Sequence, residues 1–314
     1  MNKLNLMHDT GNSVSLHREF LLLCAIDIME STMSSTDLST LAASYKENGF
    51  YFPYDVMSET EAAVSRADLE ALERANIGYA FGNKGQLNQP HVLFKFAYDI
   101  VSNPRLLDAV EAIIGPDILV WGSTYFIKEA QSPSFVSWHQ DLKYWGLDSD
   151  ALVSAWVAIS PVTRENGCMR FVPGSHTLGL VDHRDTFDET NFLTRGQEAA
   201  VDIDEDSTAY ATLKPGQASF HHGKLLHASS PNRTDDRRIG LTINFMAPHM
   251  RQIVAKTDYA MLVRGEDRYG HFEPVPPPDG NMTEETIAWH RRVVGAQNDA
   301  LYEGAAKRDG AVAV

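Results

Sequence analysis

The chain has 314 residues, of which 43% are apolar, enough to bury a full-sized core in one large domain or two small ones. Its 27 lysines and arginines face 42 aspartates and glutamates, which gives a formal net charge of −15. This charge disfavours nonspecific binding to nucleic acid or to an anionic membrane, so we expect a small-molecule partner. The two cysteines are too few for a disulfide framework or a thiolate cluster and favour a cytoplasmic protein.

The N-terminal segment contains an apolar run, FLLLCAIDIM at residues 20–29. This run has about half of the ~20 residues that a membrane span needs and includes Asp27. Acidic residues near its start also make it a poor signal peptide. We interpret residues 1–34 as an extension that is expected to be poorly ordered, with Met29 or Met33 as an alternative start. Residues 35–314 are expected to form a single domain with a C-terminal helical tail.

Helical periodicity is clearest in the first part of the chain. It predicts helices at residues 34–49, at 58–76, where Ser58 and Glu61 form a capping-box pair, and at 103–115, where Gly115 ends the pattern. A further helix is expected at residues 283–308, packed outside the core.

From residue 117 onward the sequence changes to short β-rich runs separated by turn residues. Because no long helix separates these runs, they favour a jelly roll with flanking helices over a doubly wound sheet. The predicted strands lie at residues 117–127, 152–160, 168–176, 211–222 and 239–248.

The stretch SWHQDLKYW, residues 137–145, places His139 and Asp141 two positions apart. In an extended backbone these side chains project to the same face, where imidazole and carboxylate suit Fe(II), Zn(II) or Mn(II). Alone, the pair is weak evidence, because the chain holds 12 histidines and 42 acidic residues. One more histidine would complete a two-histidine, one-carboxylate metal site.

The downstream candidates for that ligand are His176, His221, His222 and His227. His227 stands two positions before Ser229 and eleven before Arg238, which opens the apolar run IGLTINF. If Arg238 begins a strand, Gly240, Thr242 and Asn244 share its face. A buried arginine needs a fixed anion, and its planar fork fits a carboxylate, which indicates a dicarboxylate cosubstrate. A surface position for Arg238 is the alternative.

Three segments together resemble the phytanoyl-CoA dioxygenase family of iron(II)- and 2-oxoglutarate-dependent oxygenases. They are HQDLKYWGL, SAWVAISPVTRENGCMRFVPGSH and PGQASFHHGKLLHASSPNRTDDRRIGLTINF, and the similarity covers about residues 42–250. The combination of His-x-Asp, Asn-Gly-Cys ahead of Pro-Gly-Ser-His, and His with Ser at +2 and Arg at +11 is more specific than any one part. Gln217 departs from the aspartate that many relatives have there, and we expect it to affect only a turn.

The resemblance implies a double-stranded β-helix, the same jelly roll that the strand pattern predicts. It implies that His139, Asp141 and His227 hold Fe(II), and that Arg238 and Ser229 bind the distal carboxylate of 2-oxoglutarate. The implied reaction uses O2 and releases succinate and CO2 while a substrate C–H bond is oxidised. Relatives that halogenate have a small residue in place of the carboxylate, so Asp141 favours hydroxylation, or a desaturation or demethylation that follows from it.

Some residues are candidates for shaping the substrate pocket, although each could equally be a core or rim residue. They are Lys128, Trp138, Tyr144, Trp145 and Asn244. The substrate itself is expected to be a small polar metabolite, because the acidic chain disfavours a polyanion such as coenzyme A. Two other functions stay open: a Zn(II) or Mn(II) hydrolase or isomerase with the same ligands, which would have no use for Arg238, and a noncatalytic binding barrel, for which a broken ligand set is expected.

Overall fold

The computed structural model describes residues 35–75 and 86–302. The expected extension, residues 1–34, lies outside the described residues, as do residues 76–85 and 303–314. Contacts divide the chain into two compact units, Met1–Leu38 and Ser39–Val314. Apart from residues 35–38, the described residues belong to the second unit. Among the described helices, none has the length and apolar character that crossing a bilayer requires.

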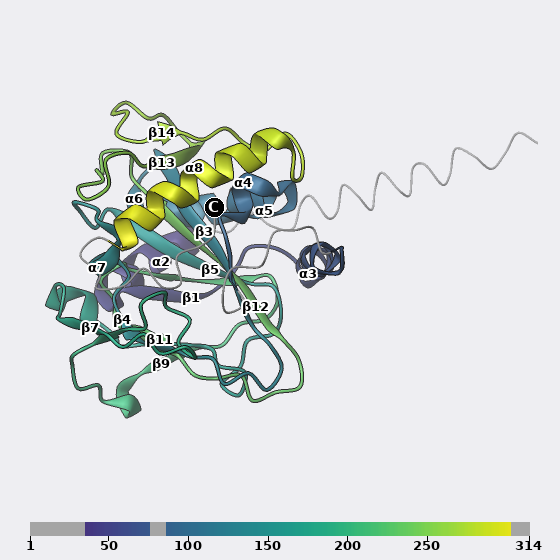
Figure 1. The fold of residues 1–314 in the computed structure, drawn as a ribbon. Coiled ribbons are helices and arrows are strands. Elements are labelled where there is room, and N and C mark those ends of the chain that lie inside the picture. Colours follow the sequence, from purple (N-terminus) through teal and green to yellow (C-terminus); the bar gives the residue numbers. More distant parts are fainter. Residues whose placement is uncertain (1–34, 76–85, 303–314) are drawn as a thin grey trace, which may run out of the picture. The chain divides into compact units, whose positions relative to one another are not determined.

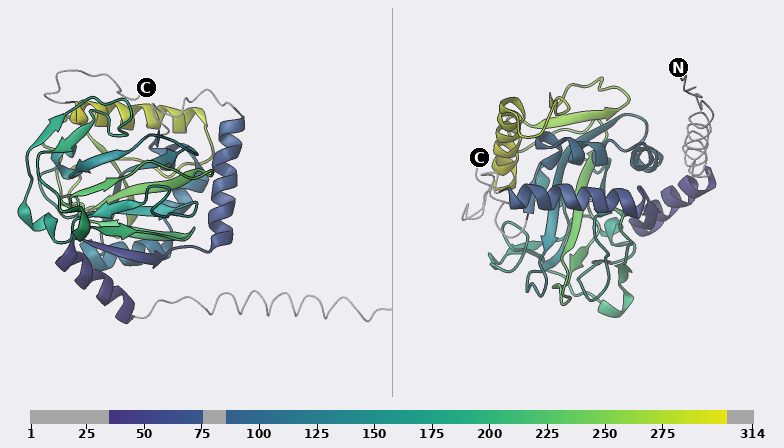
Figure 2. Two further views of the ribbon diagram at one scale, coloured as in Figure 1. Left: turned by 90° about the horizontal axis from the view of Figure 1, so that it is seen from below. Right: turned by 90° about the vertical axis from the view of Figure 1, so that its right-hand side faces the viewer.

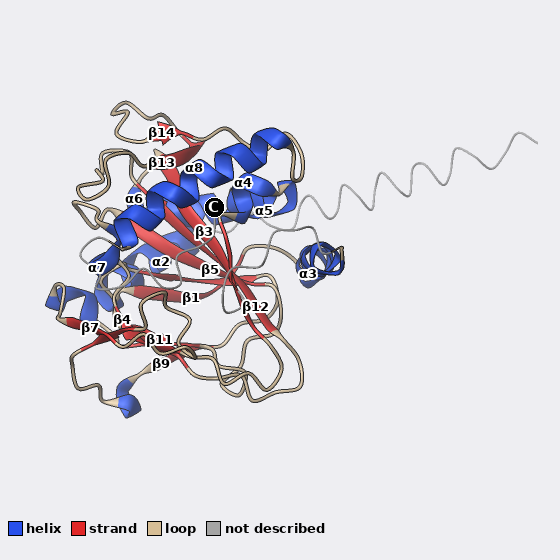
Figure 3. Cartoon of the chain, viewed as in Figure 1, coloured by secondary structure: helices blue, strands red, loops and turns tan. Residues whose placement is uncertain are grey.

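Helices and strands alternate irregularly along the chain (Figure 3). The helices are α2 (Ser35–Asn48), α3 (Glu59–Arg74), α4 (Pro90–Leu93), α5 (Lys95–Val101), α6 (Pro104–Ile114), α7 (Leu142–Trp145) and α8 (Glu284–Leu301), with 3-10 turns η1 (Ser175–Leu178) and η2 (Glu205–Ser207). The expected capping box is confirmed, because the Ser58 side chain accepts from Glu61 N while the Glu61 carboxylate accepts from Ser58 N. Asn103 caps the start of α6, and Gly115 ends it as expected.

The strands form a larger and a smaller antiparallel sheet (Figure 1). The larger sheet follows the order β1-β10-β5-β12-β3-β13-β14, with β2 also paired to β3, and only β13 and β14 run parallel. The smaller sheet follows the order β4-β11-β6-β9, and β7 pairs with β8. This sheet-rich architecture with flanking helices is the jelly roll that the sequence predicts. The strand bounds are β1 (Phe50–Asp55), β2 (Gln86–Asn88), β3 (Ile118–Lys128), β4 (Val136–His139), β5 (Leu152–Ala158), β6 (Met169–Phe171), β7 (His183–Asp185), β8 (Gln197–Ala199), β9 (Ala209–Ala211), β10 (Gln217–His221), β11 (His227–Ser229), β12 (Arg238–Met246), β13 (Tyr259–Arg264) and β14 (Glu273–Pro274).

The hydrophobic core joins the two sheets. Trp156 and Ala158 on β5 of the larger sheet pack in one buried cluster with Met169 and Phe171 on β6 of the smaller sheet. Cys168 is buried in the same cluster and is a free thiol, as expected of a small core residue. Strong burial on the facing sides of both sheets fixes the strand registers, because a slip of one residue would turn apolar side chains outward.

Helix α8 lies along one side of the larger sheet, next to α4 (Figure 2). His290 donates from Nε2 to the backbone oxygen of Asn88 at 2.8 Å, and Gln297 donates to that of Trp121 at 2.8 Å. The helix begins after its cap, Thr283, as the sequence predicts. It is more than outer packing, since Leu301 at its end lines the cavity described below.

Candidate active site

His139 and His227 are cross-strand neighbours in the smaller sheet. β4 ends at His139, β11 begins at His227, and the two residues face each other in the antiparallel register. Their ring centres lie 4.0 Å apart, and the residues are only 4% and 6% exposed. Strand pairing alone therefore brings together two histidines that are 88 residues apart in the chain.

Asp141 reaches the same point from a helical turn. Its φ of −57° and ψ of −50° place it directly before α7, so the extended backbone considered for His139 and Asp141 ends at His139. A hydrogen bond of 2.9 Å from Leu142 N to Gly223 O helps to hold this turn. Asp141 Oδ1 nevertheless lies 3.2 Å from His139 Nε2, so the two side chains converge for a different reason than the sequence argument gave.

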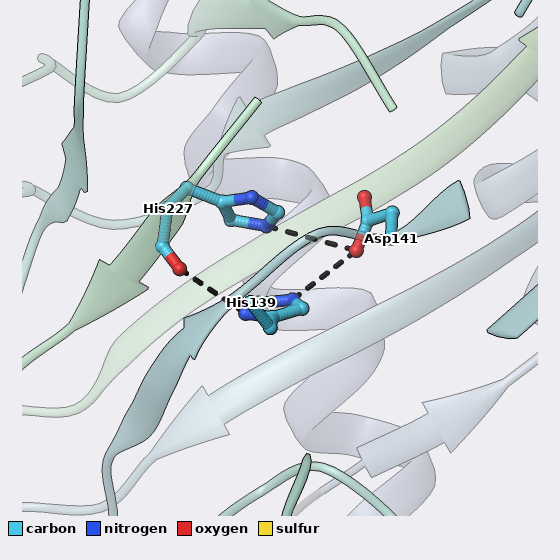
Figure 4. Close-up of side chains that lie close together, drawn as sticks. All are labelled: His139, Asp141 and His227. Carbon is cyan, nitrogen blue, oxygen red and sulfur yellow. Dashed lines mark hydrogen bonds and ion pairs between the residues drawn. The ribbon is translucent and has the colours of Figure 1, made fainter. Parts of the chain in front are cut away.

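The hydrogen bonds of the two imidazoles fix where their hydrogens lie. His139 Nδ1 is 2.9 Å from Ser137 O and His227 Nδ1 is 3.0 Å from Leu225 O. Carbonyl oxygens only accept, so both Nδ1 atoms donate and each Nε2 of a neutral ring is a bare acceptor. These Nε2 atoms face Asp141 Oδ1 at 3.2 and 3.7 Å (Figure 4). Three electron-rich atoms that converge in this way suit a divalent cation, and all three ligand atoms lie within 4.8 Å of one another.

The charge states of these residues also suit a metal site. Burial, and after it the neighbouring His139, lower the pKa of His227 well below its usual range. Burial alone would raise the pKa of Asp141, but the surrounding histidines, His227 foremost, hold that pKa well below its usual value. Neutral imidazole and ionised carboxylate are the forms that bind metal ions.

Arg238 begins β12 and is 2% exposed, which contradicts the surface alternative. Its Nη1 donates to Gly167 O at 2.9 Å, its guanidinium carbon lies 5.0 Å from the Trp156 ring centre, and its Nε has no partner. Among the described residues, no carboxylate pairs with it. Burial lowers the pKa of Arg238 to about 10. A buried guanidinium without an anion is costly, so the structure fits a carboxylate ligand at this position.

Ser229 lines the same cavity as the arginine and is oriented by a hydrogen bond from Lys128. Lys128 is directly opposite Arg238 in the register of β3 and β12 and is fully buried. Its Nζ donates to Ser229 Oγ at 2.7 Å and to Ser230 O. Since Ser229 accepts this bond, its own hydroxyl hydrogen is available to a ligand. Burial, and after it the Arg238 charge, lower the pKa of Lys128 well below its usual range.

The alternation expected along β12 is confirmed, because Arg238, Thr242 and Asn244 all line one cavity. Gly240 shares this face and leaves room for the ring of Trp156. A Cβ atom at Gly240 would lie 1.8 Å from Trp156 Cζ2. The smallest residue therefore stands beside the guanidinium because the indole occupies the space of its side chain.

The cavity has a volume of about 190 Å³ and is lined by residues of both sheets. Of the candidate substrate residues, Tyr144, Trp145 and Asn244 line it. Lys128 does not line it and acts on it through Ser229. Trp138 also stands apart from the lining, since its indole donates to Glu205 and packs against the guanidinium of Arg170.

Several lining residues were not predicted from the sequence as pocket residues. They are Gln86, Asn88, Thr124, Phe126, Phe192, Gln197 and Leu301. Gln86 and Asn88 belong to the three-residue strand β2, and Leu301 ends a helix far along the chain. Only β3 carried a usable signal: Thr124 and Phe126 are two residues apart and alternate with the buried Tyr125 and Ile127.

Two histidines and one carboxylate around one point are the ligand set of non-heme iron(II) oxygenases. Arg238 adds the feature that a dicarboxylate cosubstrate requires. Fold and site thus define the class of iron(II)- and 2-oxoglutarate-dependent oxygenases.

Comparison with known proteins agrees with this class. The family model of phytanoyl-CoA dioxygenase (PhyH) matches residues 45–240, and the chain belongs to that family. A probable alpha-ketoglutarate-dependent hypophosphite dioxygenase of Stutzerimonas stutzeri is 25% identical over 221 residues, which are 65% of this chain and 76% of that protein. Peroxisomal phytanoyl-CoA dioxygenase of Rattus norvegicus is 26% identical over 255 residues, or 72% and 75% of the two chains.

Among solved structures, the non-heme monooxygenase ThoJ is similar over nearly its whole length. It is 34% identical, with a TM-score of 0.76, over 84% of this chain and 98% of that chain. This chain is thus an enzyme of the dioxygenase type, with iron and 2-oxoglutarate as the cofactor and cosubstrate of its class.

Proposed function

We propose that this enzyme hydroxylates an unactivated C–H bond of a small polar metabolite. In the balanced reaction, substrate, 2-oxoglutarate and O2 give hydroxylated substrate, succinate and CO2. The observation that carries the proposal is one cavity that contains both the converging ligand atoms of His139, Asp141 and His227 and the guanidinium of Arg238, which has no carboxylate partner among the described residues. A metal hydrolase or isomerase would use the first feature and have no role for the second.

Under this proposal, His139 and His227 bind Fe(II) through Nε2 and Asp141 binds it through a carboxylate oxygen. Bound at such a face, Fe(II) leaves positions for 2-oxoglutarate and O2 and supplies the oxidising chemistry. The chain contributes orientation, because the Nδ1 hydrogen bonds to backbone oxygens fix both rings and aim their bare Nε2 atoms inward.

Arg238 and Ser229 bind the distal carboxylate of 2-oxoglutarate. The guanidinium offers Nε and its outer nitrogens, and the Ser229 hydroxyl adds one more donor, since Lys128 occupies its acceptor side. A planar fork that binds both carboxylate oxygens fixes direction as well as distance. The cosubstrate is thereby held with its other end toward the histidines.

The lining of the remaining cavity supports a small, uncharged, hydrogen-bonding substrate. Apart from Arg238, Asp141 and the histidines, every residue of the described lining is uncharged. Amide and hydroxyl side chains are supplied by Gln86, Asn88, Thr124, Gln197, Thr242 and Asn244, and flat apolar surface by Phe126, Trp145 and Phe192. A coenzyme A thioester would bring several phosphate charges to a lining that offers no further cation. Relatives whose names include hypophosphite, phytanoyl-CoA and ectoine show that family membership leaves the substrate open.

The test is a screen for substrate-stimulated succinate formation with Fe(II), 2-oxoglutarate and air. Paired compounds that differ only in charge, such as a primary carboxamide and its free acid, should favour the neutral member. His227→Ala should abolish turnover, and a melting curve should show that the variant still folds. Substrate conversion that does not require 2-oxoglutarate would contradict the proposal and favour a hydrolase or isomerase. Stimulation by the charged members alone would contradict the substrate class and leave the reaction type intact.

A further inference from the structure

A third histidine, His221, contacts Asp141 through the carboxylate oxygen that the other two do not face. It ends β10 of the larger sheet, is 1% exposed and lines the cavity. Its Nε2 lies 3.4 Å from Asp141 Oδ2, while His139 and His227 both face Oδ1. Residues of the smaller sheet therefore contact Oδ1 of Asp141, and a residue of the larger sheet contacts Oδ2.

The hydrogen of His221 lies on a different nitrogen from those of the two facing histidines. An ionised carboxylate only accepts hydrogen bonds, so Nε2 of His221 donates to Asp141 and Nδ1 is left bare. Nδ1 of His221 is indeed buried without a partner. His139 and His227 have the reverse arrangement, with Nδ1 bound to backbone oxygens and Nε2 bare. This difference separates a residue that donates to Asp141 from residues able to bind metal.

Sheet geometry holds His221 at this place. His221 pairs with Ser154 across β10 and β5, and Ser154 pairs with Asn244 across β5 and β12. These three side chains form a row on the inner face of the larger sheet. Ser154 Oγ lies 3.3 Å from the same Asp141 Oδ2 and 3.1 Å from Asn244 Oδ1, so its single hydrogen can serve either oxygen. Rigid strands thus position the donors around one carboxylate oxygen.

We propose that His221 is a positioning residue that keeps Asp141 a one-oxygen ligand. By binding Oδ2, it leaves Oδ1 alone to face the metal and prevents the carboxylate from occupying a second coordination position. That position is then free for the cosubstrate or O2. The inference rests on the proposed function, because it requires His139, Asp141 and His227 to bind the metal.

The experiment measures Co(II) binding to the full chain by competition with a chelator, together with the visible absorption of the Co(II) protein. His221→Leu removes the donor, and His221→Gln keeps an N–H at similar reach. The matched control is His222→Leu, because that neighbouring ring contacts Tyr45 and His176 and does not face Asp141. We expect His221→Leu to weaken Co(II) binding about 10- to 100-fold, the range found for groups that orient metal ligands. Its absorption spectrum should change with the altered carboxylate binding.

The Co(II) affinity of His221→Gln should stay within a few-fold of the wild-type value, and the affinity of His222→Leu should equal the wild-type value. Unchanged affinity and spectrum in His221→Leu would overturn the inference. The inference would also be overturned if His221→Leu lost as much Co(II) affinity as His227→Ala and His221→Gln did not restore it, because His221 would then be a metal ligand. If His221→Leu does not fold, His221→Phe, which keeps a ring and lacks the donor, decides: a weaker Co(II) site supports the Oδ2 contact, and an unchanged one contradicts it. A wild-type protein that binds no Co(II) would instead overturn the proposed function.

Discussion

Two consecutive arginines at the start of β12 lie in opposite environments. Arg237 is on the outer side, where its guanidinium binds Glu73 at 2.6 and 2.7 Å and Glu129 at 2.8 Å. Arg238 points inward and has no carboxylate partner among the described residues. Strand alternation alone separates them, because neighbouring side chains project to opposite faces. The same residue type therefore forms surface ion pairs at position 237 and, at position 238, is buried without a carboxylate partner in the described part of the chain.

Arg238→Gln is predicted to weaken 2-oxoglutarate binding about 30- to several-thousand-fold, because a charged two-point contact in a desolvated pocket is worth on the order of 2–5 kcal/mol. Binding of Fe(II) should change little, since a guanidinium has no lone pair for a metal. Arg238→Lys should restore only part of the affinity, because an ammonium lacks the planar fork. Calorimetric titration of 2-oxoglutarate and Fe(II) under anaerobic conditions measures both. Equal 2-oxoglutarate affinity in Arg238→Gln would refute the cosubstrate site.

Gly240→Ala is predicted to destabilise the protein by about 1–3 kcal/mol, the usual cost of forcing extra volume into a packed core. The new methyl group would collide with the Trp156 ring. Movement of that ring should also disturb Arg238 and weaken 2-oxoglutarate binding. Gly295→Ala in α8 is the control, because its Cβ would meet nothing within 4 Å and alanine favours helix. Equal urea midpoints for wild type and Gly240→Ala would contradict the prediction.

At the scale of elements, ion pairs tie α3 to the loop that precedes β12. Besides the Arg237 contacts, Arg66 on α3 binds Asp236 through both outer nitrogens at 2.8 and 2.9 Å. These groups are partly exposed, so solvent screening limits what each pair contributes. Several pairs that share partners nevertheless hold the helix at one position.

Arg237→Ala is predicted to lower the free energy of unfolding by about 1 kcal/mol. The change removes the ion pairs with Glu73 and Glu129 and part of the packing of the aliphatic side-chain carbons. The difference should shrink in about 1 M salt, where the screening length falls to about 3 Å. Urea unfolding at low and high salt measures it. Arg184→Ala, which breaks the single exposed pair with Glu198, should change stability less. A loss that is the same at both salt concentrations would assign the effect to packing instead.

Much of this element structure could be predicted from local sequence. Capped helices carry their own signals, as at Ser58 and Glu61 or at Asn103 and Gly115. Strands β1, β13 and β14 were missed, because they are defined by the strands they pair with, and β1 and β13 pair with β10 and β3, which are distant in sequence. The helical turn at Asp141 was not predicted, since Leu142 is anchored by Gly223, a contact that no local pattern encodes. His221 could have been found by applying to β10 the alternation already applied to β12.

At the scale of the whole molecule, the site depends on both sheets at once. The smaller sheet contributes the two facing histidines, and the larger sheet contributes Arg238, Trp156 and the row that contacts Asp141 Oδ2. The sequence resemblance named the candidate metal and cosubstrate residues, but the strand patterns did not show which faces of the two sheets meet. Loss of packing between the sheets would therefore weaken binding of the metal and of the cosubstrate together.

Fe(II) under anaerobic conditions is predicted to raise the melting temperature, because a ligand that binds only the folded state at 100 times its Kd stabilises it by about 2.7 kcal/mol. A stabilisation of 1 kcal/mol raises the melting temperature by about 2–4 °C for 150–250 residues and by less for a longer chain, so we expect a rise of a few degrees. A chelator should reverse the shift. Asp141→Ala should show almost no shift of the melting temperature with Fe(II). Addition of 2-oxoglutarate should raise the melting temperature further only in proteins that retain Arg238. The same Fe(II) shift in Asp141→Ala would show that the metal binds elsewhere.

The pairing of His139 with His227 also bears on the lifetime of the folded protein. An ion held by both would act as a reversible cross-link between β4 and β11, closing a loop of 88 residues much as a disulfide would. Without that link, the smaller sheet has few strands and short ones, and its backbone amides should exchange with solvent sooner than those of the larger sheet. Iron supply would then govern the lifetime of the polypeptide as well as its rate of turnover.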